Sequence, residues 1–379
     1  MIRQLILLVI VGWTLGYEPA QACVFCSGIG ATPTLRQEAK AASMVLYGTL
    51  ANARLTRAGG QGETDFNIEV VLKEHPILNQ RTKLTLPRYV PVDAKNPPKF
   101  LIFCDVVNQT IDPYRGSPFQ PAVVDYLRNA MRLDERDPVK ALRFFFDHLD
   151  ATDPEIAADA FREFAKASDQ DIAKAAPFFD AARIRSMLQD TKTPPEWLGV
   201  LGYLLGVVGN QEDGKILWRL ATDPNFSRRS EVSGVLAGYV SIHPAAGWKY
   251  IQTSLADGKR NLNERLPMLS TLRFFQMCKP IEYREQIIKA AKAGFIQGDL
   301  ADLITEDLRR WGWWELTEVI LSAYGRPTHA APLTARAILR YAVACPEPLA
   351  KRFVAERSKI EPEAIQDARE LLQIEQPLK

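Results

Sequence analysis

The second half of this 379-residue chain repeats a helical pattern at a steady interval. Amphipathic helices are expected to begin at places that lie 35, 34, 36 and 33 residues apart, near Pro195, Ser230, Glu264, Leu300 and Leu333. A period in this range is typical of stacked helix pairs, because one amphipathic hairpin cannot bury its own apolar face and needs a neighbour on each side. The sequence therefore predicts an all-α, right-handed solenoid of helix pairs.

The helical pattern begins before the regular repeats. Apolar residues recur at helical spacing from Val139 to Leu149, and a second run follows the start signal Asp153-Pro154. The span 168–193 is less regular and is expected to hold one or two extra helices. A final helix over 361–374 is expected to serve as a polar cap of the stack.

This helical part resembles the HEAT-like repeat proteins. The segment "DPEIAADAFREFAKA" at 153–167 is similar to the second helix of their repeat, and "DPVKALRFFF" at 137–146 precedes it. The tetratricopeptide repeat has a similar period, but its Trp, Gly, Tyr and Ala positions do not recur here. The resemblance implies a stack of helix pairs that presents an extended surface to another protein.

The first third of the chain has the pattern of a β-sheet. The stretch 65–72 alternates apolar and polar residues, as a half-buried strand requires, and a strand over 44–50 precedes it across a glycine-rich gap. Further strands are expected over 82–86 and 99–107. The second of these is an apolar run, which is typical of a strand covered on both faces. A short helix is expected over 34–42.

The same region resembles the netrin-like module, the OB-type barrel that tissue inhibitors of metalloproteinases share. The resemblance rests on an N-terminal cysteine, a helix before the strand "VLYGTL", a strand ending in "VVLKEHPIL" and another reading "KFLIFC", and it covers residues 23–110. It implies a small antiparallel β-barrel. The chain departs from the inhibitor pattern, because those proteins begin Cys-x-Cys and this chain has Cys23-Val24-Phe25-Cys26.

A change of pattern divides the chain near residue 115. The segment from Asp112 to Pro121 has no apolar period and is rich in residues that interrupt regular structure. The predicted organisation is a signal peptide over 1–22, a β-rich domain over 23–111, a linker over 112–121 and a helical-repeat domain over 122–379. The fold class is α+β with two domains, which suits the length, because single cores stop growing at about 250 to 300 residues.

The first residues predict export. One arginine is followed by the apolar stretch Leu5 to Leu15 and the triplet Ala20-Gln21-Ala22, which is the order of a secretory signal peptide. Cleavage after Ala22 would deliver the protein to the periplasm or the cell exterior. No transmembrane segment is expected in the mature chain, because no apolar run is long enough to span a membrane. A retained anchor and lipidation of Cys23 are the alternatives.

The five cysteines are unevenly distributed. Disulfides persist outside the cytoplasm, so a bridge is expected between Cys104 and either Cys23 or Cys26, which would tie the mature N-terminus to a strand. Cys278 and Cys345 lie within helical patterns. They are expected to be buried as small apolar side chains.

No pattern of residues predicts an enzymatic reaction or a cofactor. The four histidines are far apart, and no zinc, phosphate-loop, dinucleotide or serine-hydrolase motif occurs. A net charge of +2 does not favour a nucleic-acid partner. Cys23 and Cys26 could form a redox pair, or a mature Cys23 could chelate the zinc of a metalloprotease, whereas Ser27 excludes haem attachment.

A dense aromatic cluster occurs at Trp311-Gly312-Trp313-Trp314. These tryptophans are a candidate surface contact for a glycan or a peptide, although packing is expected for at least two of the three. The favoured interpretation is a non-enzymatic, exported scaffold whose helical-repeat surface binds an unidentified protein. The alternative is an envelope-localised metalloprotease inhibitor or thiol-redox accessory that acts through Cys23 and Cys26.

Overall fold

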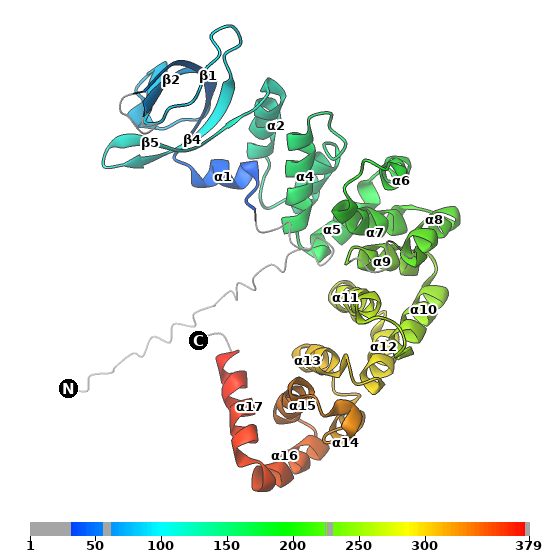
Figure 1. The fold of residues 1–379 in the computed structure, drawn as a ribbon. Helices are drawn as coiled ribbons and strands as arrows, with labels where there is room; N and C mark the ends of the chain where they lie inside the picture. The colour runs from blue at the N-terminus through cyan, green and yellow to red at the C-terminus, as the bar shows by residue number, and fades with distance from the viewer. Residues whose placement is uncertain (1–31, 56–61, 224, 226–229, 376–379) are drawn as a thin grey trace, which may run out of the picture.

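The computed structural model describes residues 32–55, 62–223, 225 and 230–375. An antiparallel sheet forms the N-terminal part and a long series of helices forms the rest, so the α+β fold class with two parts is confirmed. The helices follow one another in a wide arc, with the sheet at one end of it (Figure 1). The predicted signal peptide, Cys23 and Cys26 lie outside the described residues.

The sheet consists of five antiparallel strands that follow one short helix. These elements are α1 (Leu35–Ala41), β1 (Met44–Leu55), β2 (Gly62–Lys73), β3 (Lys83–Leu86), β4 (Lys99–Val107) and β5 (Thr110–Pro118), with a single 3-10 turn, η2 (Pro76–Leu78), before β3. The strand order is β3-β2-β1-β4-β5. The predicted barrel is not closed, because β3 and β5 are the two edges of the sheet and do not pair with each other.

Strand β4 is covered on both faces, as its apolar run predicted. Leu101 and Phe103 belong to the large core shared with the helices, whereas Ile102 and Cys104 belong to a separate apolar cluster on the other face. Successive residues of a strand face opposite sides, so burial on both sides requires an unbroken apolar run. The core is therefore continuous from one face of the sheet into the helical part.

The expectation of an irregular linker over 112–121 is wrong, because the chain up to Pro118 forms strand β5. A two-residue turn at Asn108-Gln109, both with positive φ, reverses the chain after β4. Proline and glycine are tolerated in β5 because it is an edge strand, and the register shifts next to Pro113. The position of the boundary between the two domains stays a prediction.

Helices α2 to α6 connect the sheet to the regular repeats. They are α2 (Pro121–Met131), α3 (Pro138–Phe146), α4 (Pro154–Lys166), α5 (Asp169–Ala175) and α6 (Ala181–Gln189), with η3 (Ala176–Phe178) after α5. Asp153 accepts a hydrogen bond from a backbone N–H of the first turn of α4, where Pro154 needs no such partner. The start signal Asp153-Pro154 and the extra helices within 168–193 are therefore confirmed.

The remaining helices form the repeats. They are α7 (Leu198–Val208), preceded by η4 (Pro195–Trp197), α8 (Gln211–Thr222), α9 (Val232–Ile242), α10 (Pro244–Ala256), α11 (Leu262–Cys278), α12 (Arg284–Ile296), α13 (Ala301–Trp311), α14 (Thr317–Ser322), η5 (Pro327–His329), α15 (Pro332–Ala344), α16 (Pro348–Ile360) and α17 (Pro362–Ile374). The predicted repeat starts are confirmed to within three residues at α7, α9, α11, α13 and α15. Their spacing of 34, 30, 39 and 31 residues is less even than expected, partly because α11 has 17 residues.

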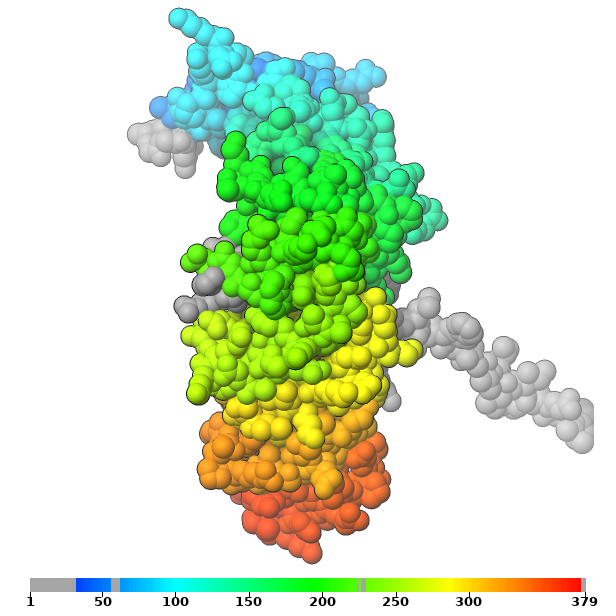
Figure 2. Space-filling model, turned by 90° about the vertical axis from the view of Figure 1, so that its right-hand side faces the viewer, coloured from blue at the N-terminus to red at the C-terminus, as the bar shows by residue number. Residues whose placement is uncertain are grey.

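The repeat helices form two layers. Helices α7, α9, α11, α13 and α15 lie on the inner side of the arc, whereas α8, α10, α12, α14 and α16 lie on the outer side (Figure 1). We call the first set, together with α17, the inner layer. A view of the outer face shows the colours in chain order along the molecule, so repeats that are neighbours in sequence are neighbours in space (Figure 2). Most of the stack thus has the one-dimensional packing that the repeat period predicts, whereas α11 also contacts α5 and α7, as the 4.6 Å between the ring centres of Tyr203 and Phe274 shows.

Two helices of the inner layer, α7 and α9, approach so closely that only glycine fits between them. A Cβ on Gly206 would lie 2.1 Å from the Cα of Gly238, and a Cβ on Gly238 would lie 2.1 Å from the carbonyl oxygen of Gly202. A Cβ on Gly234 would lie 2.1 Å from the carbonyl oxygen of Gly199. Backbone therefore packs directly on backbone where these two helices cross.

Farther along the inner layer, charged side chains make the contact between helices. Arg265 on α11 is completely buried and donates two hydrogen bonds to the carboxylate of Asp299, at 2.6 and 3.0 Å. It donates another to the carbonyl oxygen of Leu255 at 3.1 Å. Asp299 lies just before α13, so this contact joins α11 to the start of the next inner helix through a buried, charge-assisted pair of hydrogen bonds.

Two further ion pairs continue this pattern. Arg273 on α11 pairs with Asp307 on α13 at 2.8 Å, and Arg340 on α15 pairs with Glu306 on α13 at 2.7 Å. The partners in each pair lie 34 residues apart, as do Arg265 and Asp299. This separation equals about one repeat, so each pair joins equivalent positions in neighbouring repeats.

Candidate functional site

The disulfide predicted at Cys104 is not formed in the structure. Cys104 is a free thiol, completely buried in the apolar cluster on one face of β4. Burial raises the pKa of this thiol to about 12, because a thiolate is disfavoured away from water. A bridge would require another segment to enter that cluster, and the proposed partners Cys23 and Cys26 lie outside the described residues.

The two cysteines of the helical part lie at helix ends. Cys345 is buried, and Cys278 is half-buried at the end of α11. Burial raises the pKa of Cys278 to about 12. Its thiol is therefore protonated at neutral pH and is a poor nucleophile.

The predicted tryptophan contact is packed against the core. Trp313 is 5% exposed, and the guanidinium of Arg284 lies 4.2 Å from its ring centre. Trp311 contacts Trp313 with ring centres 5.3 Å apart, and Trp314 contacts Tyr341 at 5.0 Å. Trp311 and Trp314 are half-buried against the same core. This placement agrees with the expected packing and lends no support to a surface platform.

Trp218, which the sequence analysis did not single out, is more exposed than these tryptophans. It is 36% exposed on α8, and its ring lies 4.9 Å from the rings of both Tyr239 and Tyr250. The helical period of the sequence predicts this exposure, because Leu217 and Ala221 are buried on one face of α8 and Trp218 lies outside that face. Trp218 and Tyr250 lie on the outer helices α8 and α10, and Tyr239 lies on α9.

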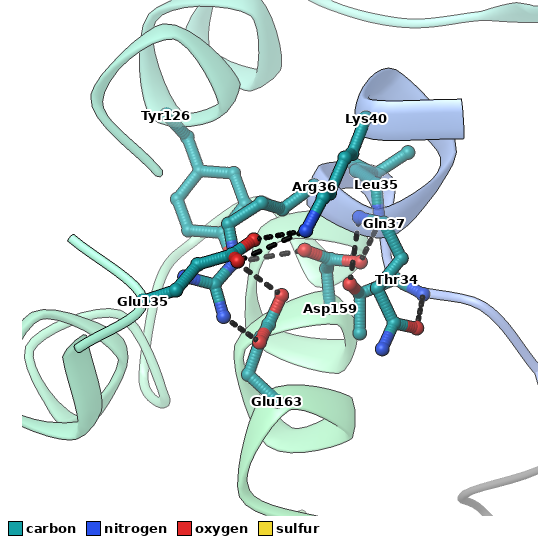
Figure 3. A network of polar contacts seen from close by, with 9 residues as sticks. All are labelled: Thr34, Leu35, Arg36, Gln37, Lys40, Tyr126, Glu135, Asp159 and Glu163. Carbon is teal, nitrogen blue, oxygen red and sulfur yellow. Dashed lines mark hydrogen bonds and ion pairs between the residues drawn. The ribbon is translucent and has the colours of Figure 1, made fainter. Parts of the chain in front are cut away.

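A polar network joins α1 to α4 and fixes the sheet to the helical part (Figure 3). The buried carboxylate of Asp159 accepts hydrogen bonds from the Leu35 N–H at 2.8 Å, the Tyr126 hydroxyl at 2.9 Å and Arg162 at 3.1 Å. The Leu35 N–H is one of the groups that the start of a helix leaves without an intrahelical partner. Burial raises the pKa of Asp159, because loss of water disfavours the charged carboxylate.

Two ion pairs brace the same network (Figure 3). Arg36 forms a two-point contact with Glu163, at 3.3 and 2.8 Å, and Lys40 binds both oxygens of Glu135, at 2.7 and 2.9 Å. The Glu163 side chain is 5% exposed and that of Glu135 is 66% exposed, so the first pair is far less screened by water. The charged groups of this junction are thus engaged with one another and hold the two parts of the molecule together.

A small hollow spans three helices of the inner layer. It measures about 240 Å³ and is lined by Val207 on α7, Ser241 on α9 and Cys278 on α11, with Tyr203 and Phe274 among its other walls. Residues about one repeat apart therefore meet at one surface. A partner that binds the inner layer would contact several repeats at once.

A larger hollow, of about 580 Å³, lies between α15 and α17. Its apolar lining includes Leu339, Ala364, Ala368, Leu371 and Ile374. Its charged lining is basic on α15 and acidic on α17, and consists of Arg336 and Arg340 on the first helix and Glu363, Asp367 and Glu370 on the second. Helix α17 was expected to be a polar cap and is polar only in part, because Leu371 and Ile374 are 40% and 79% exposed.

The described residues contain neither a metal-binding cluster nor a membrane-spanning helix. No group of three or more His, Cys, Asp and Glu residues is placed there to hold a metal ion. His329 contacts the Phe295 carbonyl oxygen, about one repeat away, at 2.9 Å, and His148 contacts the Phe144 carbonyl oxygen, one turn earlier, at 2.8 Å. No helix among these residues combines the length and apolarity needed to cross a membrane.

Comparison with known proteins gives little beyond the fold described above. No family model matches the chain, and no curated protein matches its sequence. Among solved structures, the chain is similar to human deoxyhypusine hydroxylase in complex with glycerol, with 14% sequence identity over 67% of this chain and 90% of that one. The TM-score is 0.27, which is too low for this likeness to carry an argument about function.

Proposed function

We propose that this chain is an exported, non-enzymatic scaffold that binds another protein on its helical-repeat surface. The observation that carries the proposal is the hollow lined by Val207, Ser241 and Cys278, because it brings α7, α9 and α11 to one surface. Stacked repeats suit such a role, since their inner helices offer a long surface without any need for a deep pocket. A fold alone does not determine a function, so the proposal is tested on this surface itself.

The carboxylates and thiols named below take part in structural contacts, which supports a non-enzymatic role. Asp159 accepts three hydrogen bonds at the sheet junction, and Asp213 is held by Arg185 in a two-point contact at 2.6 and 3.0 Å. The thiols of Cys104 and Cys278 have a pKa of about 12 and so remain protonated at neutral pH. These groups stabilise helix contacts or the core.

The binding test uses a photo-cross-linking residue placed on either layer of the mature chain. Position 207 on α7 faces the inner hollow, and position 249 on the outer helix α10 is exposed and serves as the matched control. We expect irradiation in the native compartment to link a specific protein to the variant at Val207 and none to the variant at Lys249. Equal adducts at both positions, or none at position 207, would contradict the proposal.

Export has its own test. When the chain is expressed with its first 22 residues, we expect the mature protein outside the cytoplasm with Cys23 as its first residue. Mass spectrometry of the purified protein gives that residue directly and also reports a lipid on Cys23 as added mass. Recovery of a chain that still begins at Met1 in the cytoplasm would contradict export.

A further inference from the structure

Helix α17 is the last inner helix that the structure describes. Each inner helix from α7 to α15 is followed by an outer helix and then by the next inner helix, whereas α17 is followed by neither among the described residues. Leu371 and Ile374 on α17 are therefore left 40% and 79% exposed, although both line the hollow between α15 and α17. In a stack of repeats, an inner helix buries this kind of face against a neighbour.

The charges around this hollow are arranged in two opposite groups. Arg336 extends from α15, and Glu363 and Asp367 extend from α17. Among the described residues, no ion pair joins these three side chains to one another or to other groups. An unpaired basic group on one helix and unpaired acidic groups on its neighbour make a surface that is complementary to itself.

We propose that two copies of this chain associate through the hollow between α15 and α17. Helices α15 and α17 pack against each other, so a two-fold axis that passes between the two copies at this hollow can place α15 of one copy over α17 of the other. Arg336 of each copy then faces Asp367 of the other, and this contact occurs twice. Ile374 and Leu371 of each copy enter the apolar part of the opposite hollow.

A second copy fits this surface better than a partner of single charge. A uniformly acidic partner would be attracted by Arg336 but repelled by Glu363 and Asp367. A uniformly basic partner would be attracted by the two carboxylates but repelled by the arginine. Two-fold pairing satisfies both groups with the same set of residues. It also covers the exposed face of α17, which neither the sheet junction nor the inner hollow involves.

The test measures the mass of the mature chain in solution by sedimentation over a wide range of concentration. We expect a dimer for the wild type. Ile374→Asp should give a monomer, because a carboxylate cannot enter the apolar hollow without losing its hydration. The matched control is Ile360→Asp, since Ile360 is also exposed (67%) but does not line the hollow, and this variant should remain a dimer.

Charge reversal tests the pairing itself. Arg336→Glu and Asp367→Lys should each weaken the dimer by about tenfold or more, because each places like charges opposite one another. The double variant restores opposite charges and should dimerise more tightly than either single variant. Arg369→Glu, on an exposed part of α17 away from the hollow, is the control that should have no effect.

Three results would overturn the proposal. They are a monomeric wild type, a dimer that Ile374→Asp leaves intact, and a double charge reversal no tighter than the single changes. A cross-linking residue at position 374 that captures a different protein from a monomeric chain would assign the hollow to that protein instead. That last outcome would leave the scaffold proposal standing, because the scaffold test uses position 207 on the inner layer.

Discussion

The inner layer is held together in two different ways along its length. Between α7 and α9, glycines such as Gly206 and Gly238 let backbone pack against backbone. Between α11, α13 and α15, arginines reach across to carboxylates, as Arg265 does to Asp299. The same repeat architecture is thus built first from close apolar packing and then from buried or half-buried charge.

This difference implies different responses to a change of residue or of solvent. A contact between backbones depends on shape, so it should be sensitive to a single added methyl group and insensitive to salt and pH. A contact between charges depends on protonation and on screening, so it should respond to both. Within the inner layer, the contacts of α11, α13 and α15 are therefore the ones that solution conditions can adjust.

The largest expected effect comes from adding a methyl group at the glycine contact. Gly238→Ala would place a Cβ 2.1 Å from the carbonyl oxygen of Gly202, so the two helices must separate. We expect the free energy of unfolding to fall by about 3 kcal/mol, as measured by denaturant titration. Gly116→Ala is the control, because its Cβ would make only ordinary contacts of 3.4 Å or more, and it should change this free energy by less than about 1 kcal/mol. Equal effects would remove the proposed role of the glycines.

The buried arginine should give the next largest effect. Arg265→Ala removes three hydrogen bonds and leaves a cavity, and we expect a loss of about 2 kcal/mol in the free energy of unfolding. The loss is moderated because the Asp299 side chain is 46% exposed and can be solvated once unpaired. Arg265→Met fills most of the volume and should recover at least half of the loss. A methionine variant as unstable as the alanine variant would show that charge, and not volume, dominates this contact.

Two carboxylates should respond to pH in opposite directions. Arg185 holds the pKa of Asp213 below its ordinary value of 3.8, whereas burial raises the pKa of Asp307 above that value. The contribution of Asp213 to stability is present above pH 3.8 and is lost as the pH falls. That of Asp307 is present below pH 3.8 and is lost as the pH rises through its folded-state pKa.

Asparagine variants measure these opposite slopes. As the pH rises from acid to neutral, the stability of Asp213→Asn relative to the wild type should decrease, and that of Asp307→Asn should increase. Urea unfolding midpoints at several pH values provide the measurement, with the wild type as the reference at each pH. Parallel slopes for the two variants would contradict the assigned environments.

The smallest expected effect is that of salt. Added sodium chloride should modestly increase amide hydrogen exchange in α13 and α15, which share the Glu306–Arg340 pair, because that pair is partly exposed and is screened by ions. Exchange in α7 and α9 should not change, since their contact contains no charge. Mass spectrometry of exchanged peptides separates the two regions, and an equal response of both would remove the distinction.

The sequence predicted the repeat helices well because their signal is periodic and local. The starts of α7, α9, α11, α13 and α15 follow from apolar spacing and from Gly or Pro breaks, which act within one or two turns. The charge pairs were also readable, because their partners are 34 residues apart and that separation is the repeat period. Apolar periodicity alone does not reveal them, because their positions are charged.

Other features depended on contacts that a local pattern does not contain. The proline and glycine residues of strand β5 predict a linker, and only its edge position makes them compatible with a strand. Exposure of Trp218 and burial of Trp313 depend on which face of each helix meets a neighbour. The hollow between α15 and α17 depends on packing between helices that no short sequence window includes.

Hydrogen exchange of a shortened chain tests most directly whether the repeats after α11 stack only on neighbouring helices. A chain that ends after Gly325 lacks α15, α16 and α17 and uncovers the face of α13. Nearest-neighbour packing predicts faster exchange in α13 and α14, with unchanged protection in α7, α9 and the sheet. Loss of protection throughout the chain, as a single closed core would produce, would contradict the account.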